Sequence, residues 1–318
     1  MECFRKSGRL EEVNKQLFNK PKAFGEILDL TFQLSKNRFV DFMKIFLILL
    51  GPIFVLEAIV YLMSGVNFFR ETGPGTVWFE QIINSFVETE PLETASLGAD
   101  LGIIGLGLVS ILLYPIAQAA VLFAVNHIRK GEEFKVGDVI KQAFSRFWAI
   151  LWGNIVFFFV IFGIMLIPII AITSIVISMG PENIIGAVIL IILLGFIFFF
   201  GFMLLITRLS FYFGSIVLDK ITPGIIRSWK LSRKRTWPLF GLYIIFYVII
   251  GAITFAVETS FGLLLGNSVL LLTINNLALL FTTMVVTVGY SVMFLDLKTR
   301  HNADDLKEML DDYQENNK

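Results

Sequence analysis

Few side chains in this sequence could perform chemistry within an apolar environment, and Glu57 is the most prominent of them. It lies in an apolar run that begins after Lys44, at a depth of about 20 Å if the run is a helix with the usual rise per residue. A carboxylate at such a depth in a membrane faces a cavity or a partner. Asn275 and Asn276 lie within a later apolar run and Glu258 ends another. With Glu57 they are predicted to form a polar pocket near the outer surface. The alternative is that Glu57 reaches the outer interface or makes a structural hydrogen bond between helices.

Residues for nucleophilic or metal chemistry are scarce. His127 and His301 are the two histidines, and Cys3 is the single cysteine. No serine has a histidine–acid pair that can be placed beside it, and two isolated histidines do not make up a metal-ligand set. We therefore predict no catalytic residue, no metal site and no cofactor.

A different interaction is indicated by the basic segment ITPGIIRSWKLSRKRTW, residues 221–237, which separates two apolar runs. Lysine and arginine beside a bilayer attract anionic headgroups, and tryptophan prefers the interface between headgroups and acyl chains. The predicted contacts with anionic lipid are Arg227, Lys230, Arg233, Lys234, Arg235, Trp229 and Trp237.

The elements that carry these residues follow from composition. Of the 318 residues 56% are hydrophobic and 16% are charged, and the mean hydropathy is +0.78. Soluble domains carry more charge, and the apolar runs are continuous and long enough to cross a bilayer as helices. We predict an all-α polytopic membrane protein with spans at roughly 42–64, 101–126, 148–178, 184–207, 238–258 and 267–295.

The distribution of positive charge predicts how these spans are oriented. Of the 26 Lys and Arg residues, all but Arg70 lie on the side of the two termini and of the links after the second and fourth spans. Basic segments stay on the cytoplasmic side, which predicts both termini inside and an outer loop at 65–100. The chain then divides into a cytoplasmic segment at 1–22, a membrane domain at 23–296 and a cytoplasmic tail at 297–318.

Three of the basic segments also have the spacing of amphipathic helices, beginning near Phe24, Val136 and Thr222. We call them elbows because each leads directly into a span, and we predict that their apolar stripes lie in the acyl boundary. In the third elbow, Thr222 and Pro223 are predicted to cap and begin the helix. Three elbow–hairpin units result, each opened by a glycine and then an aromatic residue: Gly25 and Phe32, Gly137 and Phe144, Gly224 and Trp229. The alternative is that inner loops of membrane proteins tend to be basic and amphipathic without being repeats.

The stretches that open, centre and end the chain share a recognisable pattern. They are KPKAFGEILDLTFQLSKNRF (20–39), IIRSWKLSRKRTWPLFG (225–241) and VMFLDLKTRHNADDL (292–306). In this order they resemble the membrane-domain family named after bacterial glycerophosphoryl diester phosphodiesterases. Two features depart from that pattern: Lys220 stands where an acidic residue or glycine is common, and the link between the first two spans is long.

The resemblance implies a stand-alone module of a bacterial plasma membrane. The family's phosphodiesterase activity belongs to a separate soluble barrel with a His-Arg motif and an acidic metal site, whereas neither His127 nor His301 is followed by arginine. The expected function is therefore non-enzymatic interaction with membrane lipids, above all anionic ones, or with protein. The alternative is a transporter or channel that uses the outer polar pocket; an intramembrane enzyme ranks behind both.

The tail is expected to contribute a separate element. From Asn302 onward the sequence is soluble in character, and Asn302 is predicted to cap a short amphipathic helix. This helix is expected to dock on the elbows or to bind a protein partner. No nucleic-acid partner is expected.

Overall fold

The computed structural model describes residues 21–69, 97–179, 183–266 and 268–315, with the backbone alone for residues 184, 263 and 303–315. Most of the predicted segment at 1–22 and of the outer loop at 65–100 lies outside these residues. All regular structure in the described ranges is helical. In chain order the helices are α2 (Phe24–Asn37), α3 (Phe39–Met63), α5 (Leu97–Lys130), α6 (Val136–Phe144), α7 (Phe147–Met179), α8 (Ile184–Leu209), α9 (Tyr212–Val217), α10 (Ile225–Ser232), α11 (Thr236–Val257), a π-helical turn (Glu258–Gly262), α12 (Leu263–Leu265) and α13 (Val269–Glu315).

The prediction of an all-α polytopic membrane protein is confirmed. Within the described ranges, six helices are long and apolar enough to cross a membrane: Phe39–Met63, Leu97–Lys130, Phe147–Met179, Ile185–Val217, Thr236–Gly262 and Val269–Asn302. Each overlaps one predicted span. The fourth differs most, because the predicted end at 207 is followed by the last turn of α8 and by the short helix α9.

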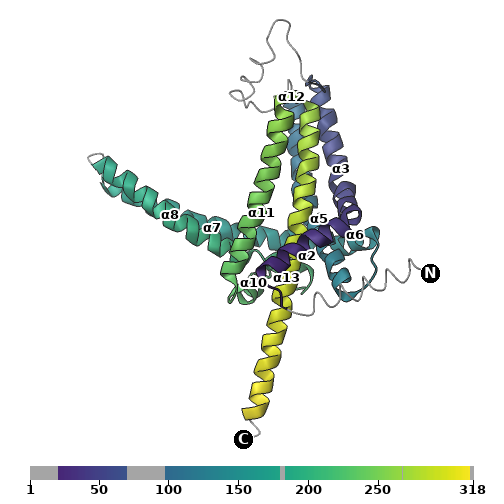
Figure 1. Cartoon of the computed structure of the whole chain (residues 1–318). Helices are drawn as coiled ribbons and strands as arrows, with labels where there is room; N and C mark the ends of the chain where they lie inside the picture. The colour runs from purple at the N-terminus through teal and green to yellow at the C-terminus, as the bar shows by residue number, and fades with distance from the viewer. Residues whose placement is uncertain (1–20, 70–96, 180–182, 267, 316–318) are drawn as a thin grey trace, which may run out of the picture.

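Four of the spans, α3, α5, α11 and α13, pack into a bundle (Figure 1). Lipid is as apolar as a helix surface, so close packing of small residues takes the place of a hydrophobic driving force between spans. Accordingly, α5 buries Ala117, Ala120 and Ala124 completely. Phe42 and Phe46 of α3 pack into the same core.

The short helices α2, α6 and α10 lie at one end of this bundle, each directly before a span (Figure 1). We call this the elbow end. α2 packs along α13 and buries Ile27, Leu30 and Leu34, whereas Phe24 and Phe32 stay exposed. Part of the apolar stripe predicted to face lipid therefore contacts protein.

The start of the third elbow differs from the prediction. α10 begins at Ile225, and the preceding Gly224 has a φ of 75°, which is strained for any residue with a Cβ. A Cβ on Gly224 would also lie 2.6 Å from the carbonyl oxygen of Tyr212. The predicted start at Thr222 and Pro223 is wrong because the left-handed residue separates them from the helix.

The glycines that open the three elbows are not structurally equivalent. Gly25 and Gly137 lie inside the first turns of α2 and α6 with open space around them, whereas Gly224 precedes its helix. The order of elbow and span recurs three times, but the register of the third elbow is different. The internal repeat stays a prediction.

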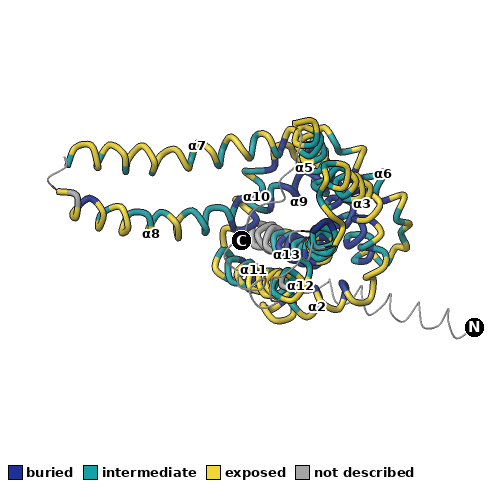
Figure 2. The backbone as a smooth tube through the Cα atoms, turned by 90° about the horizontal axis from the view of Figure 1, so that it is seen from above, coloured by how far each residue is buried: buried dark blue, intermediate teal, exposed yellow. Residues whose placement is uncertain are grey.

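The hairpin of α7 and α8 diverges from the bundle and extends to one side of it (Figures 1 and 2). No residue in the most apolar 18-residue window of either helix is buried. α9 then returns into the core, where Phe213, Ile216 and Val217 are buried. A surface this apolar needs lipid or protein around it.

The tail does not form a separate helix. α13 continues without a break from Val269 to Glu315, so Asn302 lies inside it and the predicted domain boundary at 297 falls within the helix. The prediction of a cap at Asn302 is wrong because residues 292–315 contain no glycine or proline that would end the helix. The backbone continues away from the elbow end (Figure 1), so the expected docking on the elbows is wrong as well.

Candidate functional site

Asp219 organises the polar groups at the elbow end. It lies two residues after the end of α9. Its carboxylate pairs with the Nζ of Lys298 on α13 and, at 3.5 Å, with the Nε of Arg227 on α10. The Asp219 side chain is 8% exposed, so water screens these ion pairs only weakly. One carboxylate thus joins three segments that are far apart in the sequence.

A second carboxylate, Asp296, fixes the chain where it enters α2. Its Oδ1 accepts the backbone N–H of Lys22 at 2.8 Å, and its Oδ2 accepts Nε of Arg300 at 2.8 Å. Arg300 also donates from Nη2 to the carbonyl oxygen of Lys22 at 2.6 Å. Burial lowers the pKa of the Lys22 ammonium from its usual range, and the charge of Asp296 opposes this effect.

These contacts join the three stretches, 20–39, 225–241 and 292–306, from which a family membership was predicted. Lys22 comes from the first stretch, Arg227 from the second, and Asp296, Lys298 and Arg300 from the third. The charged residues of the three stretches therefore have a common structural role: together they hold α2, α10 and α13 in place at the elbow end.

Arg208, at the end of α8, organises the third elbow. Its Nε donates to Oγ1 of Thr236 at 2.8 Å, and its guanidinium lies 4.6 Å from the ring centroid of Trp229. The hydroxyls of Ser228 and Ser232 on α10 both donate to its carbonyl oxygen, at 2.6 and 3.1 Å. The end of α8 and the start of α11 are thus held against α10.

A pocket of about 450 Å³ opens between these elements, and we call it the elbow pocket. It is lined by Gly201, Leu204, Leu205, Arg208, Trp229, Arg233, Lys234, Thr236, Trp237 and Pro238. Cationic groups, tryptophans and apolar side chains meet in one concave surface. Such a lining can hold an anionic group and part of an apolar chain together.

The predicted lipid contacts are distributed unevenly around this pocket. Four of them line it: Trp229, Arg233, Lys234 and Trp237. Lys230 is exposed on α10 and the half-buried Arg235 precedes α11, outside the lining. Arg227 lies against Asp219 instead. Sequence reasoning missed Arg208, although it opens the same basic link.

The predicted outer polar pocket is assembled only in part. Asn276 donates from Nδ2 to Oε2 of Glu57 at 3.2 Å, which joins α13 to α3. Asn275 is half-buried beside Asn276 in the sequence, and Glu258 is exposed in the π-helical turn. The structure therefore shows the interhelical hydrogen bond that was the alternative interpretation of Glu57.

His127 has a local structural contact. The Nδ1 of His127 lies 2.7 Å from Oε2 of Glu132, across the turn that follows α5. Among the described residues, no group of three or more His, Cys, Asp or Glu side chains is placed to hold a metal ion.

Comparisons with family models, with curated proteins and with solved structures give no match.

Proposed function

We propose that this chain is a non-enzymatic integral membrane protein that binds anionic lipid headgroups in the elbow pocket. The observation that carries the proposal is the combination of Arg208, Arg233 and Lys234 with two tryptophans around one pocket of about 450 Å³. Each Lys or Arg near a membrane surface adds about 1 kcal/mol to the binding of anionic lipid. Arg208 is already held by its hydrogen bond to Thr236, so it loses little freedom when it binds a ligand.

A non-enzymatic role is supported by the contacts of three acidic side chains. Asp219 and Asp296 bind cations and a backbone N–H at the elbow end, and Glu57 accepts a hydrogen bond from Asn276. General acid–base catalysis needs such groups to face a substrate, whereas these three hold helices together.

We further propose that the chain belongs to the membrane-domain family named after glycerophosphoryl diester phosphodiesterases and that it lies in a bacterial plasma membrane with both termini cytoplasmic. The three resembling stretches and the one-sided distribution of Lys and Arg support this. The continuation of α13 beyond the elbow end makes the tail a surface that a protein partner could reach.

The alternative function is a transporter or channel that uses the outer polar residues. It would need Glu57 to face a path through the membrane. The hydrogen bond between Glu57 and Asn276 is instead the kind that stabilises two neighbouring spans. The interaction module is therefore the function that the geometry supports best.

Two matched double variants test the elbow pocket. In the first, Arg233→Gln and Lys234→Gln remove two charges from the lining; in the second, Lys230→Gln and Arg235→Gln remove two charges from outside it. Both proteins are reconstituted with phosphatidylglycerol and phosphatidylcholine, and the affinity for each lipid is measured by native mass spectrometry. The first variant should lose about 2 kcal/mol, or roughly 30-fold, in affinity for phosphatidylglycerol.

The control variant should lose clearly less affinity for phosphatidylglycerol, because the charges of Lys230 and Arg235 act on the headgroup only at a distance. Raising the salt concentration should weaken the binding of phosphatidylglycerol to the wild type more than to the first variant, since exposed charges are screened. Equal losses in both variants, or no loss in either, would contradict the proposal. Arg227 is left unchanged because its substitution would break the pairing with Asp219.

A further inference from the structure

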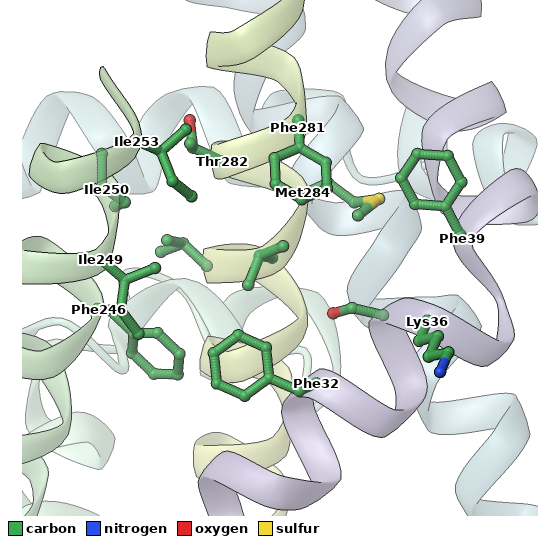
Figure 3. A pocket seen from close by; sticks show the side chains of 13 residues that line it. Phe32, Lys36, Phe39, Phe246, Ile249, Ile250, Ile253, Phe281, Thr282 and Met284 are labelled. Atoms are coloured by element: carbon green, nitrogen blue, oxygen red, sulfur yellow. The ribbon is translucent and has the colours of Figure 1, made fainter. Parts of the chain in front are cut away.

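A second cavity, separate from the elbow pocket, lies between α2, α11 and α13, and it has a volume of about 540 Å³. Its walls are almost entirely apolar; Phe246 and Ile253 come from α11, and Phe281 and Met284 come from α13 (Figure 3). This volume is within the range of about 300–1,000 Å³ that is usual for ligand sites. It shares no lining residue with the elbow pocket.

The cavity has one polar end, which α2 supplies. Ser35 and Lys36 both line it, and Figure 3 places Lys36 at the end opposite Ile253. Ser35 is 5% exposed, and its hydroxyl has no hydrogen-bond partner. A buried hydroxyl without a partner is unfavourable, so a ligand that brings an acceptor to Ser35 gains a hydrogen bond that the protein leaves open.

The length of the cavity suits part of a lipid tail. Lys36 comes three residues before the first span begins, where headgroups are expected. From Phe246 to Ile253 the lining follows α11 for about 10 Å at the helical rise per residue. That is most of the half-thickness of about 15 Å of the hydrocarbon core.

The size of the cavity argues against a protein helix as its occupant. A helix with its side chains is about 10 Å across, so 540 Å³ would hold little more than one turn of it. One flexible chain with an anionic head satisfies the volume, the apolar walls and the polar end together.

We propose that this cavity binds one acyl chain of an anionic phospholipid. The phosphate lies at Lys36, and a lipid oxygen accepts a hydrogen bond from the hydroxyl of Ser35. The proposal rests on the proposed function only for the class of ligand, because the residues are different from those of the elbow pocket. The cavity holds a tail, whereas the elbow pocket captures a headgroup. The chain would thus bind two lipids at two separate sites.

The experiment uses the full chain in nanodiscs and counts retained phosphatidylglycerol by native mass spectrometry. Ile250→Trp fills the cavity, and Val248→Trp places the same side chain on an exposed face of α11 outside the lining. Lys36→Gln removes the charge at the polar end, and Lys44→Gln removes an exposed charge on α3 that does not line the cavity. Melting temperatures without added lipid identify any variant that is misfolded.

We expect Ile250→Trp to lose one bound lipid that Val248→Trp retains. Lys36→Gln should weaken phosphatidylglycerol binding by roughly fivefold, which is the contribution of one interfacial charge, and should hardly affect phosphatidylcholine. Ser35→Ala, which hardly changes the size of the site, should weaken the binding of both lipids. Soluble glycerol phosphate should not compete, because the walls bind the tail.

Three outcomes would overturn the proposal. The first is equal lipid retention in Ile250→Trp and Val248→Trp, the second is equal effects of Lys36→Gln and Lys44→Gln, and the third is competition by soluble glycerol phosphate. If Ile250→Trp misfolds, the two lysine variants and Ser35→Ala decide the question. The elbow-pocket variant Arg233→Gln with Lys234→Gln should keep the cavity lipid, so failure of either site is seen separately.

Discussion

The side-chain amide of Asn276 donates a hydrogen bond to the carboxylate of Glu57, with nitrogen and oxygen 3.2 Å apart. The two residues lie on the last and the first span, which are neighbours in the bundle. A polar pair between two helices removes the cost of leaving either group alone among apolar side chains. Glu57 is therefore held by protein rather than left to lipid.

A double-mutant cycle measures this pair. Glu57→Ala and Asn276→Ala should each destabilise the bundle, and the double variant should be less destabilised than the sum. The expected coupling is about 0.5–2 kcal/mol, the range found for hydrogen bonds between spans. Thermal unfolding in detergent provides the measurement. Additive effects would mean that the two side chains act independently, and a loss of transport with unchanged stability would favour the alternative function.

Removing the charge of Asp219 should destabilise the elbow end. Asp219→Asn leaves Arg227 and Lys298 half-buried without their counter-charge, and we expect a loss of about 2–3 kcal/mol, discounted from fully buried pairs because the cations are partly exposed. Unfolding in detergent again measures the effect. Asp41→Asn is the control, because its pair with Arg38 is on the surface and should contribute less than about 1 kcal/mol. A similar loss in both variants would contradict the central role of Asp219.

Opposite effects are expected from alanine at two elbow glycines. Gly224→Ala should destabilise by at least about 1 kcal/mol, because the positive φ disfavours a Cβ and the Tyr212 carbonyl oxygen would be only 2.6 Å from it. Gly25→Ala has open space and should stabilise α2 by roughly 0.5–1 kcal/mol. Melting temperatures of the two variants test this contrast. Equal shifts would mean that the two elbows begin in the same way after all.

The proposed orientation can be tested by labelling in intact cells. With Cys3 replaced by serine, cysteines introduced at Thr76 and Thr94 should react with an impermeant thiol reagent, and one introduced at Ser7 should not. The reason is that positively charged segments remain in the cytoplasm during insertion. Labelling at Ser7, with protection of the other two positions, would reverse the orientation; permeabilised cells, in which all three should react, are the control.

The sequence alone was sufficient for the class and for the approximate bounds of the spans. An apolar run long enough to cross the bilayer must satisfy its own backbone hydrogen bonds as a helix, so span positions depend on local composition. The same locality identified Glu57 and the basic third elbow as exceptions within an apolar chain.

Only the tertiary structure decided which of these polar and charged residues contact one another. Whether Arg227 faces lipid or Asp219 depends on the rotation of α10 and on a partner that another segment supplies, and no spacing within 221–237 encodes that. The cavity beside Ser35 likewise arises from packing between segments distant in the chain. The periodicity of a sequence indicates which residues share a face of one helix. Which segment contacts that face depends on how all the helices pack together. For this reason Arg227, predicted to contact lipid, forms an ion pair with Asp219 instead.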